Sequence, residues 1–277
     1  MSLGKIRDWL WVTRAEPSGL AALAAIAGDR LSSGGHNAQV LLPLATSIFL
    51  AFAAGFAAHD LHDTAVDGSN APRRPVTARR LAPRTVLVVA AALFIAAVCI
   101  ACTLSAAIVG GIMAIGVILT AYSKVLKPKR WLKNASMGGL ALVPFLLPGM
   151  AWGGVRSCVG AGGFLVTLIC IREFILDMRD ADGDRANGLR TLANCVERRV
   201  AARAAFVGAV AWGALLAVWG PALIPLTQGV WCWIGAGSAV AAGLVVVAGA
   251  RSYKQFTVAT QLLHGAGLAV IVGVCLS

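Results

Sequence analysis

Residues 40–67, VLLPLATSIFLAFAAGFAAHDLHDTAVD, decide the fold of this chain, because a long apolar run ends there in a cluster of aspartates. An apolar run of this length is typical of a membrane-spanning helix. Asp60, Asp63 and Asp67 follow at steps of three and four residues, which places their carboxylates on one face of a helix. Three like charges at a membrane edge repel one another unless a cation lies between them. The stretch therefore predicts a transmembrane helix that carries a cation-binding acidic cluster.

A second acidic cluster repeats this spacing near residue 180. Asp177, Asp180 and Asp184 follow another apolar run, roughly residues 159–176, and the two clusters hold six of the twelve acidic residues. We expect the clusters to face each other across a cavity in the membrane and to share divalent metal ions. Asp182 lies off the common face and is expected to be solvated.

The composition is that of a membrane protein. Of the 277 residues, 58% are hydrophobic and only 13% are charged, with a mean hydropathy of +0.80, which is rare in soluble domains. We predict one all-α, polytopic membrane domain covering residues 1–277, with about nine transmembrane helices around a central cavity. Residues 1–16, rich in Trp, are expected to form an interfacial segment. The nine spans are expected at roughly residues 19–27, 40–58, 85–103, 106–122, 137–155, 159–176, 204–219, 230–250 and 258–276. The first is long enough to cross only if the preceding Trp-rich segment is counted in it, and otherwise eight spans remain.

The basic residues predict the topology. The net charge is +12, but the Lys and Arg residues lie in loops between the apolar runs, so the lipid bilayer and not nucleic acid is the expected partner. With nine spans, only Arg30 and Arg156 of the 24 basic residues fall on the second side of the membrane. The positive-inside rule therefore places both aspartate clusters at the cytoplasmic face of a multi-pass protein, expected in a bacterial-type cell membrane.

Two acidic clusters beside basic loops suit a diphosphate that is bound with Mg²⁺. This ion takes few carboxylates and completes its octahedral shell with phosphate oxygens and water. Arginine and lysine side chains complete the binding of the diphosphate. A membrane cavity adds an apolar wall for a hydrocarbon tail. These parts together predict ionisation of an allylic diphosphate, giving a carbocation that is protected from water.

The residues around both clusters form longer motifs. Residues 59–67 read HDLHDTAVD and are followed by NAPRRP at 70–75, whereas residues 172–185 read REFILDMRDADGDR. Between them lie YSKVLK at 122–127 and, further on, Asn134. These motifs resemble those of the UbiA superfamily of intramembrane prenyltransferases, N-D-x-x-D-x-x-x-D followed by R-P, then R-E-x-x-x-D-x-x-D-x-x-G-D-R. The resemblance covers nearly the whole chain, including the number of helices.

The resemblance implies roles for particular residues. Mg²⁺ would be held, directly or through water, by Asp60, Asp63, Asp67, Asp177, Asp180 and Asp184. Catalytic roles are implied for Asp63, Asp67, Asp180, Asp184 and Tyr122, whose ring can stabilise a cation. The diphosphate would be bound by Arg74 and Lys127, with Arg73, Lys124 and Arg185 as weaker candidates. His59 stands where the family has Asn, and with Asn134 it is expected to line the pocket or to orient Asp63.

The implied activity is Mg²⁺-dependent transfer of a prenyl group from a prenyl diphosphate to a small lipophilic acceptor, expected to be aromatic, with release of diphosphate. The R-E…G-D-R stretch and the spacing Tyr-Ser-x-x-Leu-Lys look closer to members that alkylate glycerol phosphate lipids, which is one alternative. A membrane terpene cyclase that needs no acceptor is a second. A cation-coupled transporter is a third, from another class, but its carboxylates are expected near the middle of the membrane and not at helix ends.

Overall fold

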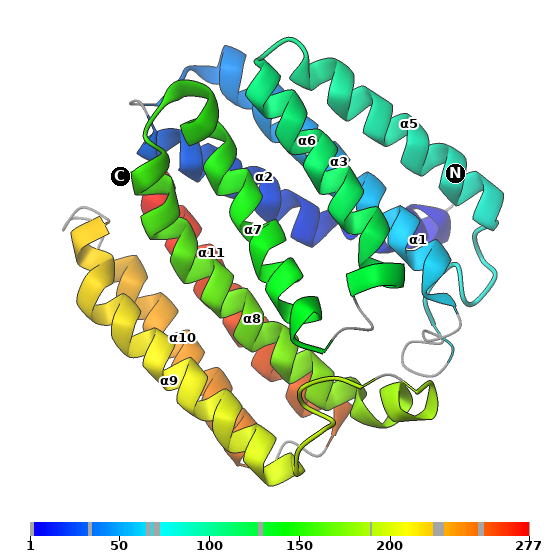
Figure 1. Cartoon of the computed structure of the whole chain (residues 1–277), viewed down its shortest axis with the longest axis vertical. Helices are drawn as coiled ribbons and strands as arrows, with labels where there is room; N and C mark the ends of the chain where they lie inside the picture. The colour runs from blue at the N-terminus through cyan, green and yellow to red at the C-terminus, as the bar shows by residue number, and fades with distance from the viewer. Residues whose placement is uncertain are drawn as a thin grey trace.

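The computed structural model describes residues 3–32, 35–64, 68, 73–126, 130–188, 190–223, 230–248 and 252–276. All the regular structure in these residues is helical, which confirms the all-α prediction (Figure 1). The elements are α1 (Leu3–Val12), α2 (Ala15–Leu31), α3 (Ala38–His62), α5 (Pro83–Ala101), α6 (Ala106–Ala121), the π-helical turn η1 (Tyr122–Leu126), α7 (Arg130–Trp152), α8 (Val155–Ala186), α9 (Arg198–Leu223), α10 (Val230–Val247) and α11 (Tyr253–Cys275).

Seven of the described helices are long and apolar enough to cross a membrane: α3, α5, α7, α8, α9, α10 and α11. The other two predicted spans correspond to α2, of 17 residues, and α6, of 16 residues. Both are shorter than the roughly 20 residues of a typical crossing, even for a helix that is not tilted. The helix α8 continues ten residues past the predicted end of its span at residue 176, because the aspartate-rich segment prolongs the helix without a break.

Six of the described helices form a ring, and α1, α5, α9 and α10 lie outside it. Around the ring, α2 packs on α3, α3 on α6, α6 on α7, α7 on α8, α8 on α11, and α11 on α2 again. Outside the ring, α5 packs against α3 at one edge of the molecule, and α9 and α10 pack at the opposite edge (Figure 1). One hydrophobic core joins α3, α5 and α6 to parts of α2 and α7. Another joins the four helices α8, α9, α10 and α11. The ring leaves space at its centre.

One close helix contact narrows this ring. A Cβ atom added at Gly28 of α2 would lie 2.4 Å from the carbonyl oxygen of Phe145 on α7. Only glycine permits two helix backbones to approach so closely, as is typical of packing inside membranes. Gly28 lies near the end of α2 that is remote from Asp60. The two helices α2 and α7 are therefore in close contact at the end of the ring away from the aspartates.

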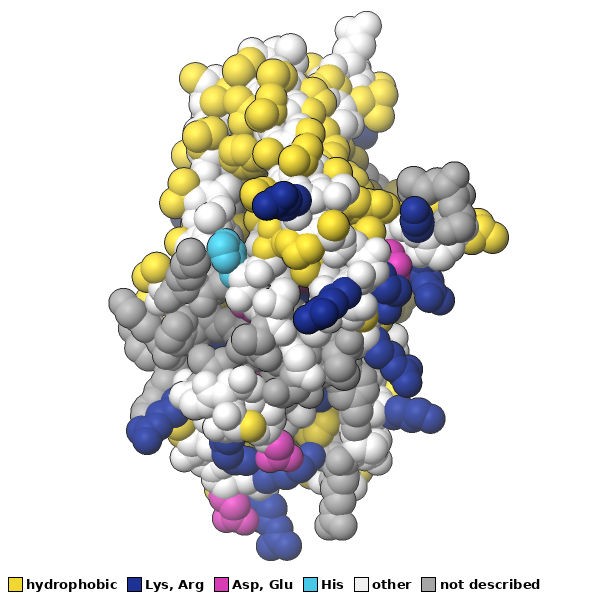
Figure 2. Space-filling model, turned by 90° about the vertical axis from the view of Figure 1, so that its right-hand side faces the viewer, with side chains coloured by type: hydrophobic (Ala, Val, Ile, Leu, Met, Phe, Trp, Pro, Cys, Tyr) yellow, Lys and Arg dark blue, Asp and Glu magenta, His cyan; other side chains and the backbone are white. Residues whose placement is uncertain are grey.

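The N-terminal segment is a separate helix. Arg14, with a left-handed φ of 43°, interrupts the chain between α1 and α2, so the Trp-rich entry is not continuous with the first span. Buried Asp8 on α1 accepts hydrogen bonds from Arg80 Nε at 3.1 and 3.0 Å, and this pair fixes α1 to the segment before α5. Figure 2 shows hydrophobic side chains over the upper part of one face and Lys and Arg mainly over its lower half, as expected for a bundle with one basic membrane side.

Candidate active site

A cavity of about 420 Å³ lies inside the ring, between α2, α3, α7, α8 and α11. Its polar wall consists of Arg14, His59, Asp63, Arg74, Tyr122, Lys133, Arg172, Glu173, Arg179, Asp180, Asp184 and His264. Its apolar wall includes Leu20, Ala21, Ala24, Phe52, Phe56, Met137, Leu140, Pro144, Leu165, Leu168, Leu263 and Ile271. Most of the polar residues gather around the ends of α3 and α8, whereas Arg172 and Glu173 lie further along α8, and the apolar residues continue deeper into the bundle.

The first aspartate cluster lies where α3 ends. Asp63 is buried on the cavity wall, and its Oδ2 lies 3.6 Å from His59 Nε2. Asp60 is also buried, but its Oδ1 accepts hydrogen bonds from Arg14 Nη2 and Arg74 Nη1, each at 3.2 Å. Asp60 therefore binds two arginines that themselves line the cavity. The third predicted member, Asp67, lies outside the described residues.

The second cluster lies on the last three turns of α8. Asp180 and Asp184 line the cavity, and Asp180 accepts two hydrogen bonds from the neighbouring Arg179, at 2.7 and 2.8 Å. Asp177 is fully buried and forms an ion pair with Lys133 of α7. Asp177 is not among the described residues of the cavity wall, so this cluster presents two carboxylates to the cavity.

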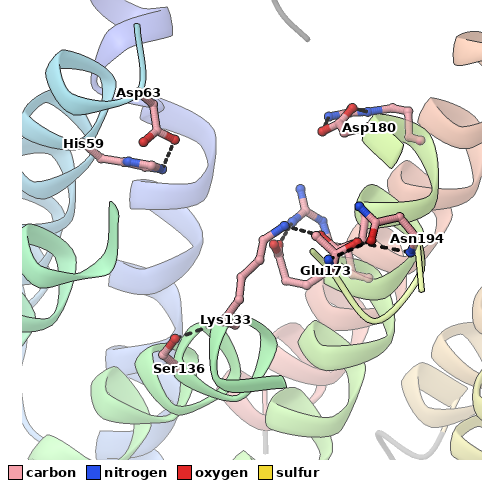
Figure 3. A network of polar contacts seen from close by, with 11 residues as sticks. His59, Asp63, Lys133, Ser136, Glu173, Asp180 and Asn194 are labelled. Atoms are coloured by element: carbon pink, nitrogen blue, oxygen red, sulfur yellow. Dashed lines mark hydrogen bonds and ion pairs between the residues drawn. The ribbon is translucent and has the colours of Figure 1, made fainter. Parts of the chain in front are cut away.

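The two clusters meet across the cavity. In Figure 3, His59 and Asp63 on one side face Asp180 on the other, and Lys133 extends from α7 toward Glu173 between them. This is the juxtaposition that the repeated spacing predicted. Glu173 is buried on the wall and accepts a hydrogen bond from Arg172 Nη1 at 2.9 Å.

An aromatic ring lies beside the first cluster. Tyr122, in η1 just past the end of α6, is buried on the cavity wall, and its ring meets the His59 ring edge-on at a centroid distance of 5.3 Å. A neutral ring at this position can stabilise a carbocation in the cavity.

The other predicted ligands fall into four groups. Arg74 lines the cavity as expected. Arg73 is exposed, and Arg185 is exposed and paired with Asp182 at 3.0 Å, so neither belongs to the described wall of the cavity. Asn134 is buried behind the wall, and its side-chain amide has no hydrogen-bond partner among the described residues. Lys127 and the side chain of Lys124 lie outside the described part of the chain.

Several wall residues were not predicted from the sequence. Lys133 and Arg14 are the clearest, since both are ion-paired to predicted metal ligands. A signal for Lys133 was present: it lies on the same face of α7 as Met137, Leu140 and Pro144, at helical spacings of four, seven and eleven residues. The sequence alone did not indicate that this apolar face lines a cavity.

The carboxylates on the wall fit Mg²⁺. In the described residues, no three metal-binding side chains lie close enough together to hold an ion by themselves. Asp63, Asp180 and Asp184 nevertheless offer hard oxygen donors to one cavity from two sides. Because Mg²⁺ commonly uses one or two carboxylates and takes its other ligands from phosphate and water, this donor set suits an ion shared with a diphosphate.

An acidic and basic end joined to an apolar chamber defines an intramembrane site for a molecule with an anionic head and an apolar tail. The model of the UbiA prenyltransferase family matches residues 18–270, and the chain belongs to this family of enzymes. A relative from Halobacterium salinarum, a digeranylgeranylglyceryl phosphate synthase, is 34% identical over 227 residues, covering 78% of this chain and 76% of the relative.

Two solved structures of UbiA homologues have similar folds. The homologue from Aeropyrum pernix K1 has a TM-score of 0.79 at 17% identity, covering 94% of this chain and 98% of the other. The homologue from Archaeoglobus fulgidus bound to DMAPP and Mg²⁺ has a TM-score of 0.66 at 14% identity, covering 96% and 99%. At these identities the likeness confirms the fold, a polytopic intramembrane bundle.

Proposed function

We propose that this enzyme transfers a prenyl group from a prenyl diphosphate to the hydroxyl group of a glycerol phosphate lipid, in an Mg²⁺-dependent reaction at the cytoplasmic face of the membrane. The observation that carries the proposal is the cavity in which Asp63, Asp180 and Asp184 share one end with basic groups and lead into an apolar chamber. The Mg²⁺ bound by the Archaeoglobus fulgidus homologue supports the choice of metal. The positive-inside rule supports the orientation.

The polar end would bind the diphosphate. Asp63 from α3 and Asp180 and Asp184 from α8 would hold Mg²⁺, which neutralises charge on the departing diphosphate. Arg74 adds a guanidinium that can donate two parallel hydrogen bonds to phosphate oxygens. The bond between the first prenyl carbon and the diphosphate oxygen breaks, and the acceptor oxygen forms the new bond to that carbon. The hydroxyl proton leaves with the diphosphate, and the ring of Tyr122 stabilises the positive charge in between.

The apolar chamber would hold the prenyl tail. Along α8 the wall runs from Asp180 to Leu165, and fifteen residues of helix span roughly 22 Å. Apolar side chains along this length exclude water, which would otherwise capture the carbocation and give an alcohol. The chamber therefore provides both binding energy and protection of the intermediate.

Arg172 favours an acceptor that carries a phosphate. It lies on the wall eight residues before Asp180, roughly 12 Å deeper along α8. One of its nitrogens donates to Glu173, and its buried Nε has no partner among the described residues. A phosphate on the acceptor can accept hydrogen bonds from the guanidinium group on the cavity wall, whereas an uncharged aromatic ring offers no such acceptor. Together with the name of the Halobacterium salinarum relative, this supports the glycerol phosphate alternative over the aromatic acceptor that we expected first.

The test is incubation of the purified protein with prenyl diphosphates of several lengths, read by mass spectrometry. The acceptors are a prenylated glycerol phosphate, the same lipid without its phosphate, and 4-hydroxybenzoate as an aromatic acceptor. We expect a diether product with the phosphorylated lipid only, and no turnover with EDTA. A prenylated benzoate would contradict the acceptor class. A cyclic hydrocarbon or alcohol from the donor alone would support a terpene cyclase instead.

A further inference from the structure

We propose that Lys133 is a direct ligand of the diphosphate and that Asp177 holds it in place, so that Asp177 is a positioning residue and not a metal ligand. This inference rests on the diphosphate chemistry proposed above but not on the identity of the acceptor. It changes the role that the resemblance implied for Asp177, and it gives a role to a lysine that the motifs did not include.

The geometry separates the two residues by their access to the cavity. Lys133 lies in the first turn of α7, reaches α8, and forms an ion pair with Asp177 Oδ1. The lysine side chain lines the cavity, whereas the aspartate side chain is fully buried and belongs to no described part of the wall. The ammonium group therefore lies between the Asp177 carboxylate and the cavity. A ligand in the cavity meets the lysine first.

This arrangement opposes metal binding at Asp177. An ion that reached this carboxylate would have to displace the ammonium group and leave it in a buried place without its partner, which is strongly unfavourable. The second oxygen of Asp177 is enclosed as well, and it has no hydrogen-bond partner among the described residues. Asp180 and Asp184 on the same helix differ from Asp177 because both line the cavity, and Arg179, which pairs with Asp180, lines the cavity as well.

The same arrangement suits an anion in the cavity. An ammonium group has three N–H donors, and the ion pair with Asp177 needs one of them. In Figure 3 Lys133 lies between the side that carries Asp63 and the side that carries Asp180. Its remaining donors are thus placed where a diphosphate bound between these aspartates would lie. A fixed cation at this position stabilises the charge that develops on the leaving group without reorganising.

Two titrations of the purified protein in detergent test the inference. The first measures Mn²⁺ retained in equilibrium dialysis, with Mn²⁺ standing in for Mg²⁺. We expect D177N to bind Mn²⁺ as the unmodified protein does, and D180N to bind at least about tenfold more weakly. The second measures binding of inorganic diphosphate at saturating Mn²⁺. We expect K133M to weaken it at least about tenfold, the effect of losing a hydrogen bond from a charged donor, and K133R to retain most of it.

A double variant separates direct contact from charge balance. K133M alone leaves a buried carboxylate unpaired, so it is compared with K133M/D177L, in which the whole pair is replaced by apolar groups and the fold is expected to tolerate the change. If Lys133 contacts the diphosphate, the double variant binds it as weakly as K133M. If Lys133 only neutralises Asp177, the double variant regains normal binding and the inference is overturned. The matched control is K254M, at an exposed lysine away from the cavity wall, which we expect to change neither titration.

The outcomes distinguish this inference from the proposed function. Loss of Mn²⁺ binding in D177N equal to that in D180N would make Asp177 a metal ligand and would overturn the inference while supporting the metal site. Failure of the unmodified protein to bind Mn²⁺ or diphosphate would contradict the proposed function itself, and the inference with it.

Discussion

Replacement of Asp60 by asparagine is predicted to destabilise the protein even when no divalent metal is present. In the structure this carboxylate is buried and accepts hydrogen bonds from Arg14 and Arg74, which come from the start of α2 and from the segment before α5. The pair of arginines thereby fixes the end of α3 to two other parts of the chain. A residue whose only task is to bind metal would leave the metal-free protein unaffected when replaced.

The size of the effect follows from burial. Breaking a fully buried ion pair costs about 3–5 kcal/mol, because a charge remains without its partner. Here the carboxylate side chain is 2% exposed but the two arginine side chains are 24% and 22% exposed, so water reaches them and reduces the cost. We therefore expect a loss of about 2 kcal/mol in D60N. For a chain of this size that corresponds to a fall in Tm of about 4–8 °C.

The assay is thermal unfolding of the purified protein in detergent with EDTA, followed by the fluorescence of its tryptophans. D180N serves as the comparison, since among the described residues Asp180 pairs with its partly exposed neighbour Arg179, and the Tm of this variant is expected to fall by less than about 2 °C. An unchanged Tm for D60N in EDTA, with a fall only when Mg²⁺ is added to both proteins, would refute the reasoning. Asp60 would then be a metal ligand whose contacts with the arginines contribute little.

Three other changes test the chamber and the acceptor. Ala24→Phe places a large ring on the deep apolar wall, and competition between donors, read by mass spectrometry, should shift toward shorter prenyl diphosphates; an unchanged preference would place the tail elsewhere. Arg172→Leu should raise KM for the phosphorylated lipid at least about tenfold and leave KM for the prenyl diphosphate unchanged, and an equal rise for both substrates would count against a contact with the acceptor phosphate. Tyr122→Phe should keep kcat within a few fold, whereas Tyr122→Leu should lower it about tenfold; equal loss in both variants would assign the role to the hydroxyl group and not to the ring.

The spacing of the aspartates predicted much of the site, because helical periodicity fixes which side chains share a face of one helix. It could not predict which of them face the cavity. Asp177 and Asp184 share a face of α8, yet one pairs with a lysine from α7 and the other lines the cavity. That difference depends on how α7 packs against α8, which is a property of two helices and not of either sequence pattern. Likewise, Asp60 and Asp63 differ in their surroundings: Asp60 pairs with Arg14, which is far away in the sequence, whereas Asp63 lines the cavity.

The spans were predicted from the length of the apolar runs, which is a local property of the sequence. The same runs also predicted that the elements are helices and in which order they occur. The predicted and observed ends differ where polar residues continue a helix. Residues 177–186 prolong α8 because Asp, Arg and Ala are compatible with helix once the preceding turns exist, and a hydropathy pattern does not register such an extension. The separation of α1 from α2 depends on one left-handed residue, Arg14, for which apolar patterning gives no signal.

The contact of Gly28 with Phe145 has a consequence for how the substrate range of this enzyme can change. About one helical turn beyond Ala24, the main chain of α2 at Gly28 packs directly on the main chain of α7 at Phe145. No side chain at this contact can therefore be shortened to enlarge the chamber. Point mutations in the surrounding wall can make the enzyme accept shorter tails. Longer tails would require α2 and α7 to separate, so an increase in substrate length is expected to need several coordinated substitutions.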